Sequence, residues 1–243
     1  MTPSFQIRYY HRLGSTNDEA RRLAADGAAA ATVVVADEQT AGRGRQGRAW
    51  TSPPGNLFAS VLLRPAVPTG RFGELALLAG VAVADTVAGL MPSRDASLRV
   101  RLKWPNDVLI DGAKTAGILV EQEGDAAILG IGINVGQRPS GIPYPATALA
   151  LAGASAGVEV VLERLLAALG AGLHLWETEG FAAIRTAWLA RAHPLGSALR
   201  VRRGVAAEEA VIEGRFAGLD PAGALLLDTA AGQRRIVAGE VAG

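Results

Sequence analysis

The sequence predicts an α+β domain followed by a small all-β domain. Before His193-Pro194, short apolar strands alternate with long helical segments, and after it only closely spaced short strands remain. The chain has 243 residues, of which 49% are hydrophobic, so it can bury one large core and one smaller core. We therefore predict two domains, residues 1–193 and 194–243.

The N-terminal part of the chain predicts a strand, a helix and two further strands. The helix begins in the run from Ser15 to Glu19, where Thr16 and Glu19 have capping-box spacing, and it ends at Gly27. Polar residues at the start of this helix directly follow the first strand. The strands are expected over 5–13, near 31–36 and over 57–63.

The central part of the chain predicts a buried helix and then antiparallel strands. The apolar segment 74–90 predicts the helix, and every second residue from Leu98 to Trp104 is apolar, which indicates a half-buried strand. The dipeptide Asp111-Gly112 is a hairpin turn signal. The remaining expected elements are hairpin strands over 108–110 and 117–121, a strand over 126–135, a loop over 136–147, helices over 158–178 and 181–192, and barrel strands over 198–203, 209–216, 223–228 and 233–238.

The composition excludes several classes of protein. Lys and Arg number 24 against 23 Asp and Glu, whereas duplex-binding proteins carry a basic excess. The lack of cysteine excludes a disulfide scaffold, a thiolate metal site and a thiol nucleophile. The N-terminus has no apolar segment of signal-peptide length, and the apolar run 75–84 is too short to cross a bilayer. We therefore expect a cytoplasmic protein that does not bind membranes.

The stretch AGRGRQGRAW, residues 41–50, contains a literal G-x-G-x-x-G and three arginines. A dinucleotide fingerprint requires a helix directly after the glycines, and Pro53-Pro54 excludes one here. A cationic loop whose amides and guanidinium groups surround an anion is consistent with the sequence, as is a solvated turn. Because the three arginines repel one another, we expect residues 41–49 to be mobile without a ligand and ordered with one.

Five polar clusters lie at expected strand ends or loops, and each also has a purely structural interpretation. Ser15 and Thr16 suit helix caps, Lys103 suits an exposed strand position, and Trp50 suits the core. Glycines at alternate positions of a strand indicate either a kink or the close approach of a ligand. The clusters are Ser15-Thr16-Asn17, Gln39 with the arginine loop, Lys103-Trp104-Pro105-Asn106-Asp107, Lys114-Thr115-Ala116-Gly117 and Gly130-Ile131-Gly132-Ile133-Asn134.

In their order and spacing, these clusters resemble the catalytic core of biotin–protein ligases. The matching motifs are STN, GRGRQGRAW, KWPNDV, KTAGILVE and GIGINV, and the segment EGRFAGLDPAGALLLD with the later GE resembles the family's C-terminal domain. The resemblance runs from about residue 11 to residue 241. It implies a catalytic domain like that of class II aminoacyl-tRNA synthetases, with a mixed sheet and flanking helices, and then a small SH3-like β-barrel.

The resemblance also implies a reaction in two steps that needs ATP, Mg²⁺ and biotin as a substrate. The biotin carboxylate attacks the α-phosphorus of ATP, which gives biotinyl-5′-AMP and pyrophosphate. A lysine amine on the biotin carboxyl carrier domain of a biotin-dependent carboxylase then attacks the acyl carbon. Two unit negative charges 4 Å apart repel by about 4 kcal/mol at an effective dielectric constant of 20, so fixed cations are needed where carboxylate and phosphate meet.

The resemblance assigns roles to individual residues. Lys103 lies at the reacting carboxyl and α-phosphate, Arg43 closes over the intermediate, and Arg45 meets phosphate or carboxylate oxygens. Trp50 stacks on adenine and Asn134 hydrogen-bonds it. The biotin contacts are Ser15, Thr16, Asn17, Gln39 and the backbone near Gly42, Gly117, Gly130 and Gly132. Asn106 and Asp107 shape the ATP side, and Asp107 is the candidate metal ligand.

The sequence departs from the family pattern at Ala148, where relatives commonly have serine. Because a strand begins by Phe5, we expect no N-terminal DNA-binding domain, no repressor role and no sequence-specific DNA binding. Lipoate ligases and octanoyl transferases of the same fold remain the alternative, as does a nucleic-acid-binding module that uses the arginine loop. The sequence leaves open the acceptor carboxylase and whether the protein is a monomer or a homodimer.

Overall fold

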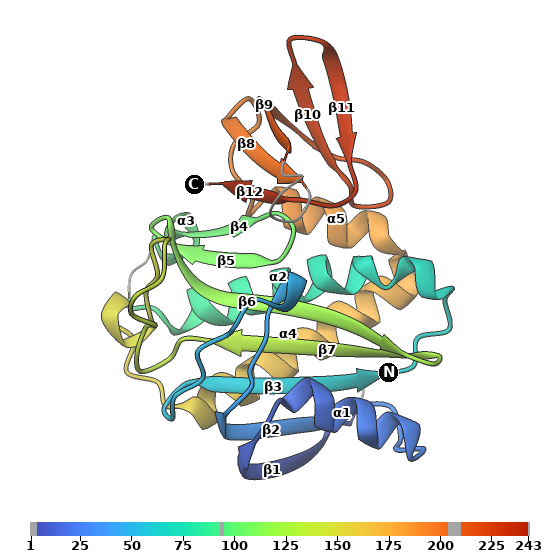
Figure 1. The fold of residues 1–243 in the computed structure, drawn as a ribbon, viewed down its shortest axis with the longest axis vertical. Coiled ribbons are helices and arrows are strands. Elements are labelled where there is room, and N and C mark those ends of the chain that lie inside the picture. The colour runs from blue at the N-terminus through green and yellow to red at the C-terminus, as the bar shows by residue number, and fades with distance from the viewer. Residues whose placement is uncertain (1–3, 93–94, 204–209, 243) are drawn as a thin grey trace.

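The computed structural model describes residues 4–92, 95–203 and 210–242. The first domain is built on a seven-stranded mixed sheet with the order β1-β2-β3-β7-β6-β5-β4 (Figure 1). Strands β1 and β2 are parallel and the other neighbours are antiparallel. The strands are β1 Gln6–Leu13, β2 Thr32–Gln39, β3 Leu57–Leu63, β4 Val100–Lys103, β5 Asp107–Ile110, β6 Ala113–Glu123 and β7 Ala126–Ile133.

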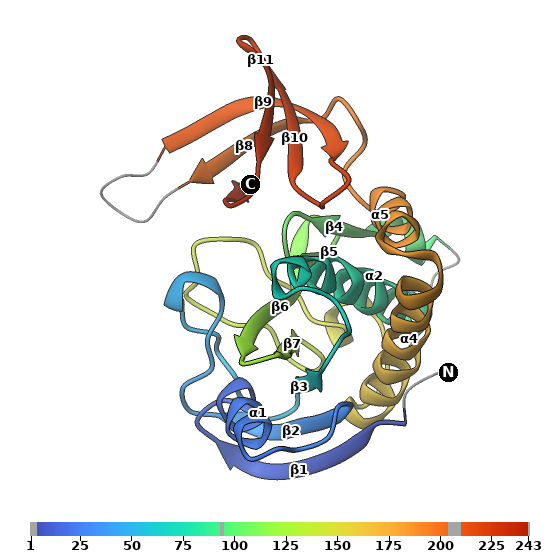
Figure 2. The same ribbon diagram turned by 90° about the vertical axis from the view of Figure 1, so that its right-hand side faces the viewer.

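Helix α1 (Thr16–Ala25) covers one face of this sheet. Its residues Ala20 and Leu23 are buried against Val34, Leu62 and Ile128 of the strands below. The other face carries α2 and α4, so the sheet lies between helices, as the view from the side shows (Figure 2). Because α1 follows directly on β1, its N-terminal residues are placed at the end of the sheet where the arginine loop also begins.

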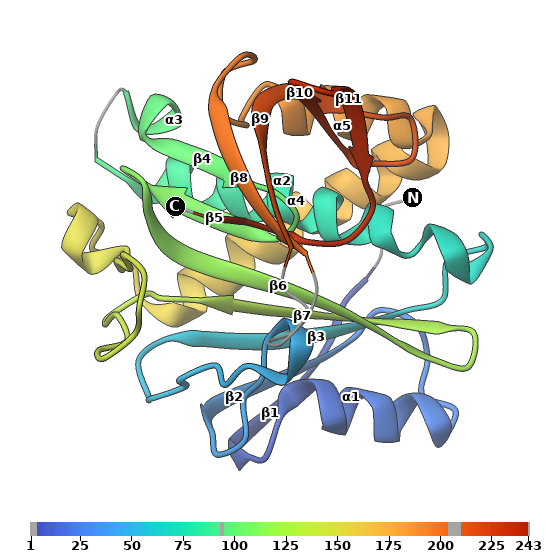
Figure 3. The ribbon, with the colours of Figure 1, turned by 45° about the horizontal axis from the view of Figure 1, so that its top comes forward.

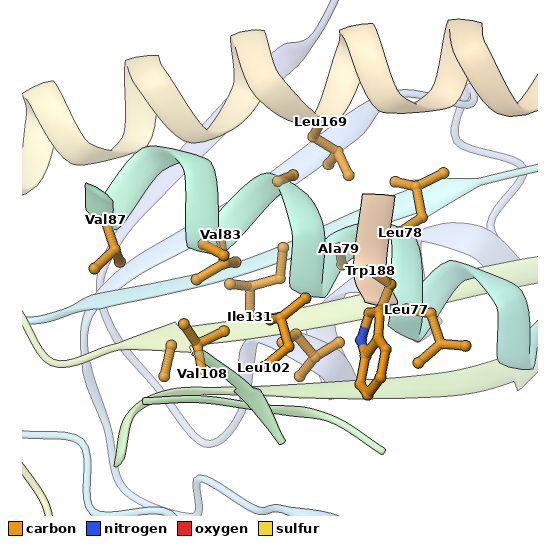
Figure 4. Close-up of a cluster of buried hydrophobic side chains, with 14 of the residues drawn as sticks. Leu77, Leu78, Ala79, Val83, Val87, Leu102, Val108, Ile131, Leu169 and Trp188 are labelled. Atoms are coloured by element: carbon orange, nitrogen blue, oxygen red, sulfur yellow. The ribbon is translucent and has the colours of Figure 1, made fainter. Parts of the chain in front are cut away.

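The main core lies between the sheet and the helices α2 (Gly73–Leu90), α4 (Val158–Glu179) and α5 (Phe181–Leu189). Side chains of α2 point toward sheet residues on one side, while Leu169 of α4 lies on the other side (Figure 4). Leu78 and Val83 are essentially inaccessible to solvent, and burial of each such side chain contributes roughly 2 kcal/mol. The segment 69–90 is long and apolar enough to span a membrane, but here it is a core helix.

Three sequence expectations about local structure are wrong. Leu98 lies in a short helix, α3 (Ala96–Arg99), and its side chain is exposed, so the alternating strand starts only at Val100. The helix predicted over 181–192 ends at Leu189. The capping box is absent because Thr16 is already the first residue of α1, and the Glu19 carboxylate accepts hydrogen bonds from Arg22 and Tyr10 instead.

The Asp111-Gly112 hairpin is confirmed. Both residues have positive φ angles, 50° and 78°, which suit the right-handed twist of a two-residue hairpin turn. The turn joins β5 to β6 directly, and β6 begins at Ala113, several residues earlier than expected. The Lys114-Thr115-Ala116-Gly117 cluster is therefore part of a strand rather than of a loop.

The second domain is a five-stranded antiparallel sheet with the order β11-β10-β9-β8-β12. It lies above β4 and β5 of the large sheet (Figures 1 and 3). The indole N–H of Trp104 donates a 3.1 Å hydrogen bond to the carbonyl of Gly223, which anchors the two domains to each other. The strands are β8 Ala198–Arg203, β9 Ala210–Leu219, β10 Leu225–Thr229, β11 Gly232–Ile236 and β12 Glu240–Ala242.

The connection between α5 and β8 contains the predicted domain boundary after residue 193. The first barrel strand was expected over 198–203 and is found there. The second, expected over 209–216, runs over 210–219 in the described part of the chain, and residue 209 lies outside it. The strand β12 was not expected, because its three residues are too short to show a pattern.

Candidate active site

A cavity of about 670 Å³ lies between the large sheet and the second domain. Its walls come from the start of α1, the arginine loop, strands β4 to β7, the loop 136–147 and strands β8 and β12. The structure therefore brings together segments that are far apart in the sequence. The predicted site residues that line it are Ser15, Thr16, Asn17, Gln39, Arg43, Arg45, Trp50, Lys103, Asn106, Asp107, Gly117, Gly130 and Gly132.

One end of the cavity is built from uncharged hydroxyl and amide groups. Ser15 is the N-cap residue of α1 and lines the cavity, and its side chain makes no capping hydrogen bond to the helix. Gln39 Oε1 accepts hydrogen bonds from the backbone N–H and the hydroxyl of Thr16, at 2.8 and 3.0 Å. Gln39 Nε2 donates to Ser52 Oγ at 2.9 Å, so the orientation of this amide is fixed.

Asn17 is held by groups on both sides of its amide. Its Oδ1 lies 2.6 Å from Ser60 Oγ and its Nδ2 lies 2.7 Å from a Glu121 oxygen. The amide fills the space beside Gly130, where a Cβ atom would overlap it. Gly130 therefore makes room for the Asn17 side chain. The sequence had suggested a kink or the close approach of a ligand at this position, not a contact with another residue of the protein.

The arginine loop forms a short hairpin rather than the start of a long helix. Gly44 N–H donates to the Arg48 carbonyl at 2.7 Å, and Trp50 N–H donates to the Gly42 carbonyl at 2.9 Å. A Cβ atom at Gly42 would lie 2.6 Å from the Trp50 carbonyl and from Ser52 Oγ, so only glycine fits there without rearrangement. Gly42 thus supports the loop from outside the cavity rather than lining it.

Each arginine of the loop has an oxygen acceptor, so the expectation that the three repel one another unopposed is wrong. Arg43 Nη2 lies 2.9 Å from Glu121, Arg45 Nη1 donates to the Gly239 carbonyl at 3.0 Å, and Arg48 Nη1 lies 2.6 Å from Glu240. Two of these acceptors belong to the second domain and close the cavity from above. The expected mobility of residues 41–49 remains a prediction.

Lys103 is the last residue of β4 and its side chain is half-buried in the cavity. Burial lowers its pKa from the ordinary value of 10.5, and the positive charges of Lys114 and Arg202 act in the same direction. The carboxylates of Asp107 and Glu240 oppose this change. Removal of water around the ammonium group strengthens its interaction with any anion that enters.

Asp107 forms a buried ion pair rather than an open metal ligand. Its carboxylate lies 2.6 Å from Lys114 Nζ, and the two side chains are only 8% and 17% exposed. Lys114 also lies over the rings of Trp50 and Tyr144, at 5.3 and 5.5 Å from their centroids. The carboxylate is therefore already neutralised by a cation, which argues against the metal role that the sequence suggested for it.

Trp50 lies in a slot made by two glycines. A Cβ atom at Gly132 would lie 2.7 Å from its indole, and one at Gly117 would lie 3.0 Å from it. The indole Nε1 is buried and has no hydrogen-bond partner among the described residues. Asn134 lines a separate small cavity on the Trp50 side, and its Nδ2 donates to the Thr147 carbonyl at 3.0 Å.

Several lining or supporting residues were not predicted from the sequence. Ser60 and Glu121 hold Asn17, while Lys114 neutralises Asp107, although the Lys114 cluster itself was noted. Arg202 and Glu240 reach the cavity from the second domain. The signal that could have revealed Glu240 is the GE dipeptide near the C-terminus, whereas an arginine in a barrel strand carries no such signal. Asn106 ties its turn to β6 through a 2.7 Å hydrogen bond from Nδ2 to the Ile118 carbonyl.

Comparison with known proteins agrees with this architecture. Residues 9–137 match the model of the biotin/lipoate A/B protein ligase family, and residues 199–242 match that of the biotin protein ligase C-terminal domain. A biotin–[acetyl-CoA-carboxylase] ligase of Paracoccus denitrificans is 39% identical, over 95% of this chain and 97% of its own length. The bifunctional ligase/repressor BirA of Bacillus subtilis is 36% identical, over 96% of this chain and 72% of its own length.

The fold is also shared with solved structures. A biotin protein ligase from Aquifex aeolicus, solved in complex with biotin and ATP, matches with a TM-score of 0.83 and 30% identity, over 98% of this chain and 97% of that one. The predicted fold class is thus confirmed: a mixed sheet with flanking helices, followed by a small antiparallel domain. By sequence and by fold, the chain belongs to the biotin protein ligase family.

Proposed function

We propose that this protein uses ATP to activate biotin and transfers the biotinyl group to a lysine of a biotin carboxyl carrier domain. The observation that carries the proposal is the composition of the 670 Å³ cavity, which combines uncharged polar groups with an excess of cations. Hydroxyl and amide groups line the end near α1. Six cationic side chains line the cavity against two acidic ones: Arg43, Arg45, Arg48, Lys103, Lys114 and Arg202 against Asp107 and Glu240.

The first step joins two anions, and the cations of the cavity suit it. A biotin carboxylate oxygen attacks the α-phosphorus of ATP, the bond to the β-phosphate oxygen breaks, and pyrophosphate leaves. Lys103 is the proposed catalytic residue at the reacting atoms, because its ammonium group is half-buried and charged groups act strongly there. Arg43 and Arg45 are proposed to hold phosphate or carboxylate oxygens, which the forked guanidinium group binds well.

The second step needs no nucleophilic side chain of this protein. The amine of the carrier lysine attacks the acyl carbon of biotinyl-5′-AMP, the bond to the AMP oxygen breaks, and the amine loses a proton. The acyl-adenylate is reactive toward water and other amines, so it must stay enclosed until the carrier arrives. The arginine loop, held on one side by Glu121 and on the other by β12, is placed to enclose it.

The polar end of the cavity suits the ureido ring of biotin. That ring offers two N–H donors and one carbonyl acceptor, and Ser15 supplies a hydroxyl that is not used in helix capping. Leu119, which lies on the same face of β6 as Gly117, lines the same cavity and suits the acyl chain, whereas the side chains of Ile118 and Ile131 are buried in the main core. Thr16, Asn17 and Gln39 are bonded to one another or to Ser60 and Glu121, so we assign them mainly to fixing the shape of this end.

The adenine side is proposed to be formed around Trp50. Its ring is held in the slot between Gly117 and Gly132, and its buried Nε1 has no acceptor within the described part of the chain. An unsatisfied buried donor costs about 1–3 kcal/mol, which a bound acceptor would recover. Asn134 lies next to the same ring and is proposed to contribute an amide contact.

Mg²⁺ is proposed to be held by the phosphates of ATP rather than by a dedicated protein site. In residues 4–92, 95–203 and 210–242 there is no group of three or more His, Cys, Asp or Glu side chains that could hold a metal ion. Asp107, the one candidate from sequence, is paired with Lys114. Mg²⁺ typically keeps its waters and binds through substrate phosphates, where it would neutralise charge on the leaving group.

Pyrophosphate release tests the proposed substrate class. The protein is incubated with ATP, Mg²⁺ and one of three acids: biotin, lipoate or octanoate. We expect release with biotin only, because a ureido ring is needed to use the polar end of the cavity. Release with lipoate or octanoate but not with biotin would favour the alternative ligase of the same fold.

A further inference from the structure

Glu121, on β6, does not line the cavity but is bonded to two side chains that do. Its Oε2 accepts hydrogen bonds from Asn17 Nδ2 at 2.7 Å and from Arg43 Nη2 at 2.9 Å. Its Oε1 accepts from Arg43 Nη2 at 3.2 Å and from Arg43 Nε at 3.3 Å. One carboxylate thus connects helix α1, which forms the polar end of the cavity, with the loop that covers it.

We propose that Glu121 is a positioning residue with two effects: it holds Arg43 over the cavity, so that the acyl-adenylate is retained, and it fixes the amide of Asn17, so that biotin binds tightly. This inference rests on the proposed function, because it concerns the retention of biotinyl-5′-AMP. Glu121 acts only through the side chains it holds. It is therefore distinct from Lys103, Arg43 and Arg45, which are proposed to contact the reactants.

The orientation of Asn17 follows from the chemistry of Glu121. A carboxylate only accepts hydrogen bonds, so the donor Nδ2 must face it and Oδ1 must face Ser60. Oδ1 then takes the single proton of the Ser60 hydroxyl. The hydroxyl of Thr16, 2.8 Å from Ser60 Oγ, must therefore donate its own proton, either to Ser60 or to Gln39. Glu121 thus determines which groups donate and which accept in the hydrogen bonds at the polar end of the cavity.

Arg43 is held along two edges of its guanidinium group. Glu121 accepts from the Nε–Nη2 edge, and Asp18 accepts from Nη1 at 2.6 Å. The hydrogen bond to Asp18, and after it that to Glu121, raises the pKa of Arg43. The Asp18 side chain is 54% exposed and that of Glu121 25%, so water competes more strongly for Asp18. We infer that a bound phosphoanhydride replaces Asp18 as the partner of Nη1, while Glu121 keeps its hold.

The variant Glu121→Gln tests this assignment, with Asp18→Asn as its matched control. Glutamine has the same size, but its NH₂ group must face either Asn17 Nδ2 or Arg43, where only donors are present. We expect biotinylation of an unrelated lysine-rich protein, measured relative to a carrier domain, to rise about tenfold, the effect of losing one charge-assisted hydrogen bond. With Asp18→Asn it should stay within about twofold of the wild type, because exposed ion pairs contribute little.

A double-mutant cycle separates positioning from a general loss of structure. If Glu121 acts through Arg43, adding Glu121→Gln to Arg43→Gly should not raise bystander labelling beyond that of Arg43→Gly alone. The KM for biotin should still rise in Glu121→Gln, through Asn17, while the rate of pyrophosphate release at saturation changes little. If Glu121→Gln folds poorly, Glu121→Asp serves instead and should give an intermediate increase, because it keeps the charge and shortens the reach.

Two outcomes would overturn the inference: bystander labelling at the wild-type level in Glu121→Gln, or a further increase when it is added to Arg43→Gly. A wild-type protein that does not biotinylate the carrier at all would contradict the proposed function instead. The two failures are therefore distinguished in the same experiment.

Discussion

The indole of Trp50 lies so close to Gly132 that a Cβ atom at residue 132 would be 2.7 Å from both Cε2 and Nε1. The glycine is on β7 and the tryptophan follows the arginine loop, so the contact joins the sheet to the loop. The space where a Cβ atom would lie is therefore occupied by another side chain of the protein at both glycines of the Gly130-Ile131-Gly132 segment. Asn17 occupies it at Gly130, and Trp50 occupies it at Gly132.

Gly132→Ala should displace the Trp50 ring and weaken ATP binding. The added methyl group would overlap the rigid indole ring, and neither the ring nor the strand backbone can move far to relieve the overlap. Such overpacking typically costs about 1–3 kcal/mol. Calorimetric titration measures the affinity for ATP and, separately, for biotin. The loss of affinity should be larger for ATP. Gly89→Ala is the control, since residue 89 has open space around it. Equal ATP affinity in Gly132→Ala and the wild type would contradict the proposed stacking role of Trp50.

Lys103→Ala should slow adenylation by about 10²–10³-fold, the typical effect of removing one fixed charge-stabilising donor. The expected change is in the burst of pyrophosphate release with biotin and ATP. Arg101→Ala is a matched control, because Arg101 lies two residues earlier on β4 and its guanidinium donates to the carbonyls of Ser97 and Val100 outside the cavity. An unimpaired burst in Lys103→Ala would exclude the assigned role.

The pH dependence of adenylation should show the lowered pKa of Lys103. The step needs the protonated ammonium group, so kcat/KM for biotin should fall as pH rises through a pKa below 10.5. In Lys103→Arg the fall should move to higher pH, because a guanidinium stays protonated there. Pyrophosphate release without carrier is the right assay, since the carrier lysine titrates in the opposite sense. If kcat/KM falls at the same alkaline pH in the wild type and in Lys103→Arg, a group other than Lys103 causes the fall.

Asp107→Asn should destabilise the fold by about 3 kcal/mol, because it leaves the buried Lys114 ammonium without its counter-ion. Urea unfolding gives the change in free energy of unfolding. Asp111→Asn is the control: it breaks an Arg99–Asp111 ion pair of the same 2.6 Å length whose side chains are 35% and 54% exposed, and the loss should stay below about 1 kcal/mol. If both variants lose a similar free energy of unfolding, burial is not what makes the Asp107–Lys114 ion pair important for stability.

The sequence predicts the large elements because long apolar segments are buried over most of their surface. Helix α2 and strands β3 and β7 are of this kind, and the Asp111-Gly112 turn is fixed by local chemistry. Leu98 was misplaced because the alternation does not show where the strand begins: Leu98 lies in α3, and only the later alternating residues Val100 and Leu102 are in β4. Thr16 was misplaced by one position because Ser15 and Thr16 are equally good caps by composition alone.

The site was predictable only where motif residues themselves line the cavity. Contacts such as Asn17 with Glu121, 104 positions apart, depend on how β6 lies beside α1, which no local pattern encodes. The closing of the cavity by β12 depends on how the second domain docks through Trp104 and Gly223. The partners of Arg45 and Arg48 were missed for the same reason, since both belong to that domain.

Biotin transfer by this protein is tested most directly by the mass of a carrier domain after incubation with the protein, biotin, ATP and Mg²⁺. We expect the mass to increase by one biotinyl group on the carrier lysine, only when both biotin and ATP are present, and much more slowly with Lys103→Ala. If the mass of the carrier stays unchanged under conditions in which a known biotin ligase modifies the same carrier, the protein does not transfer biotin to it.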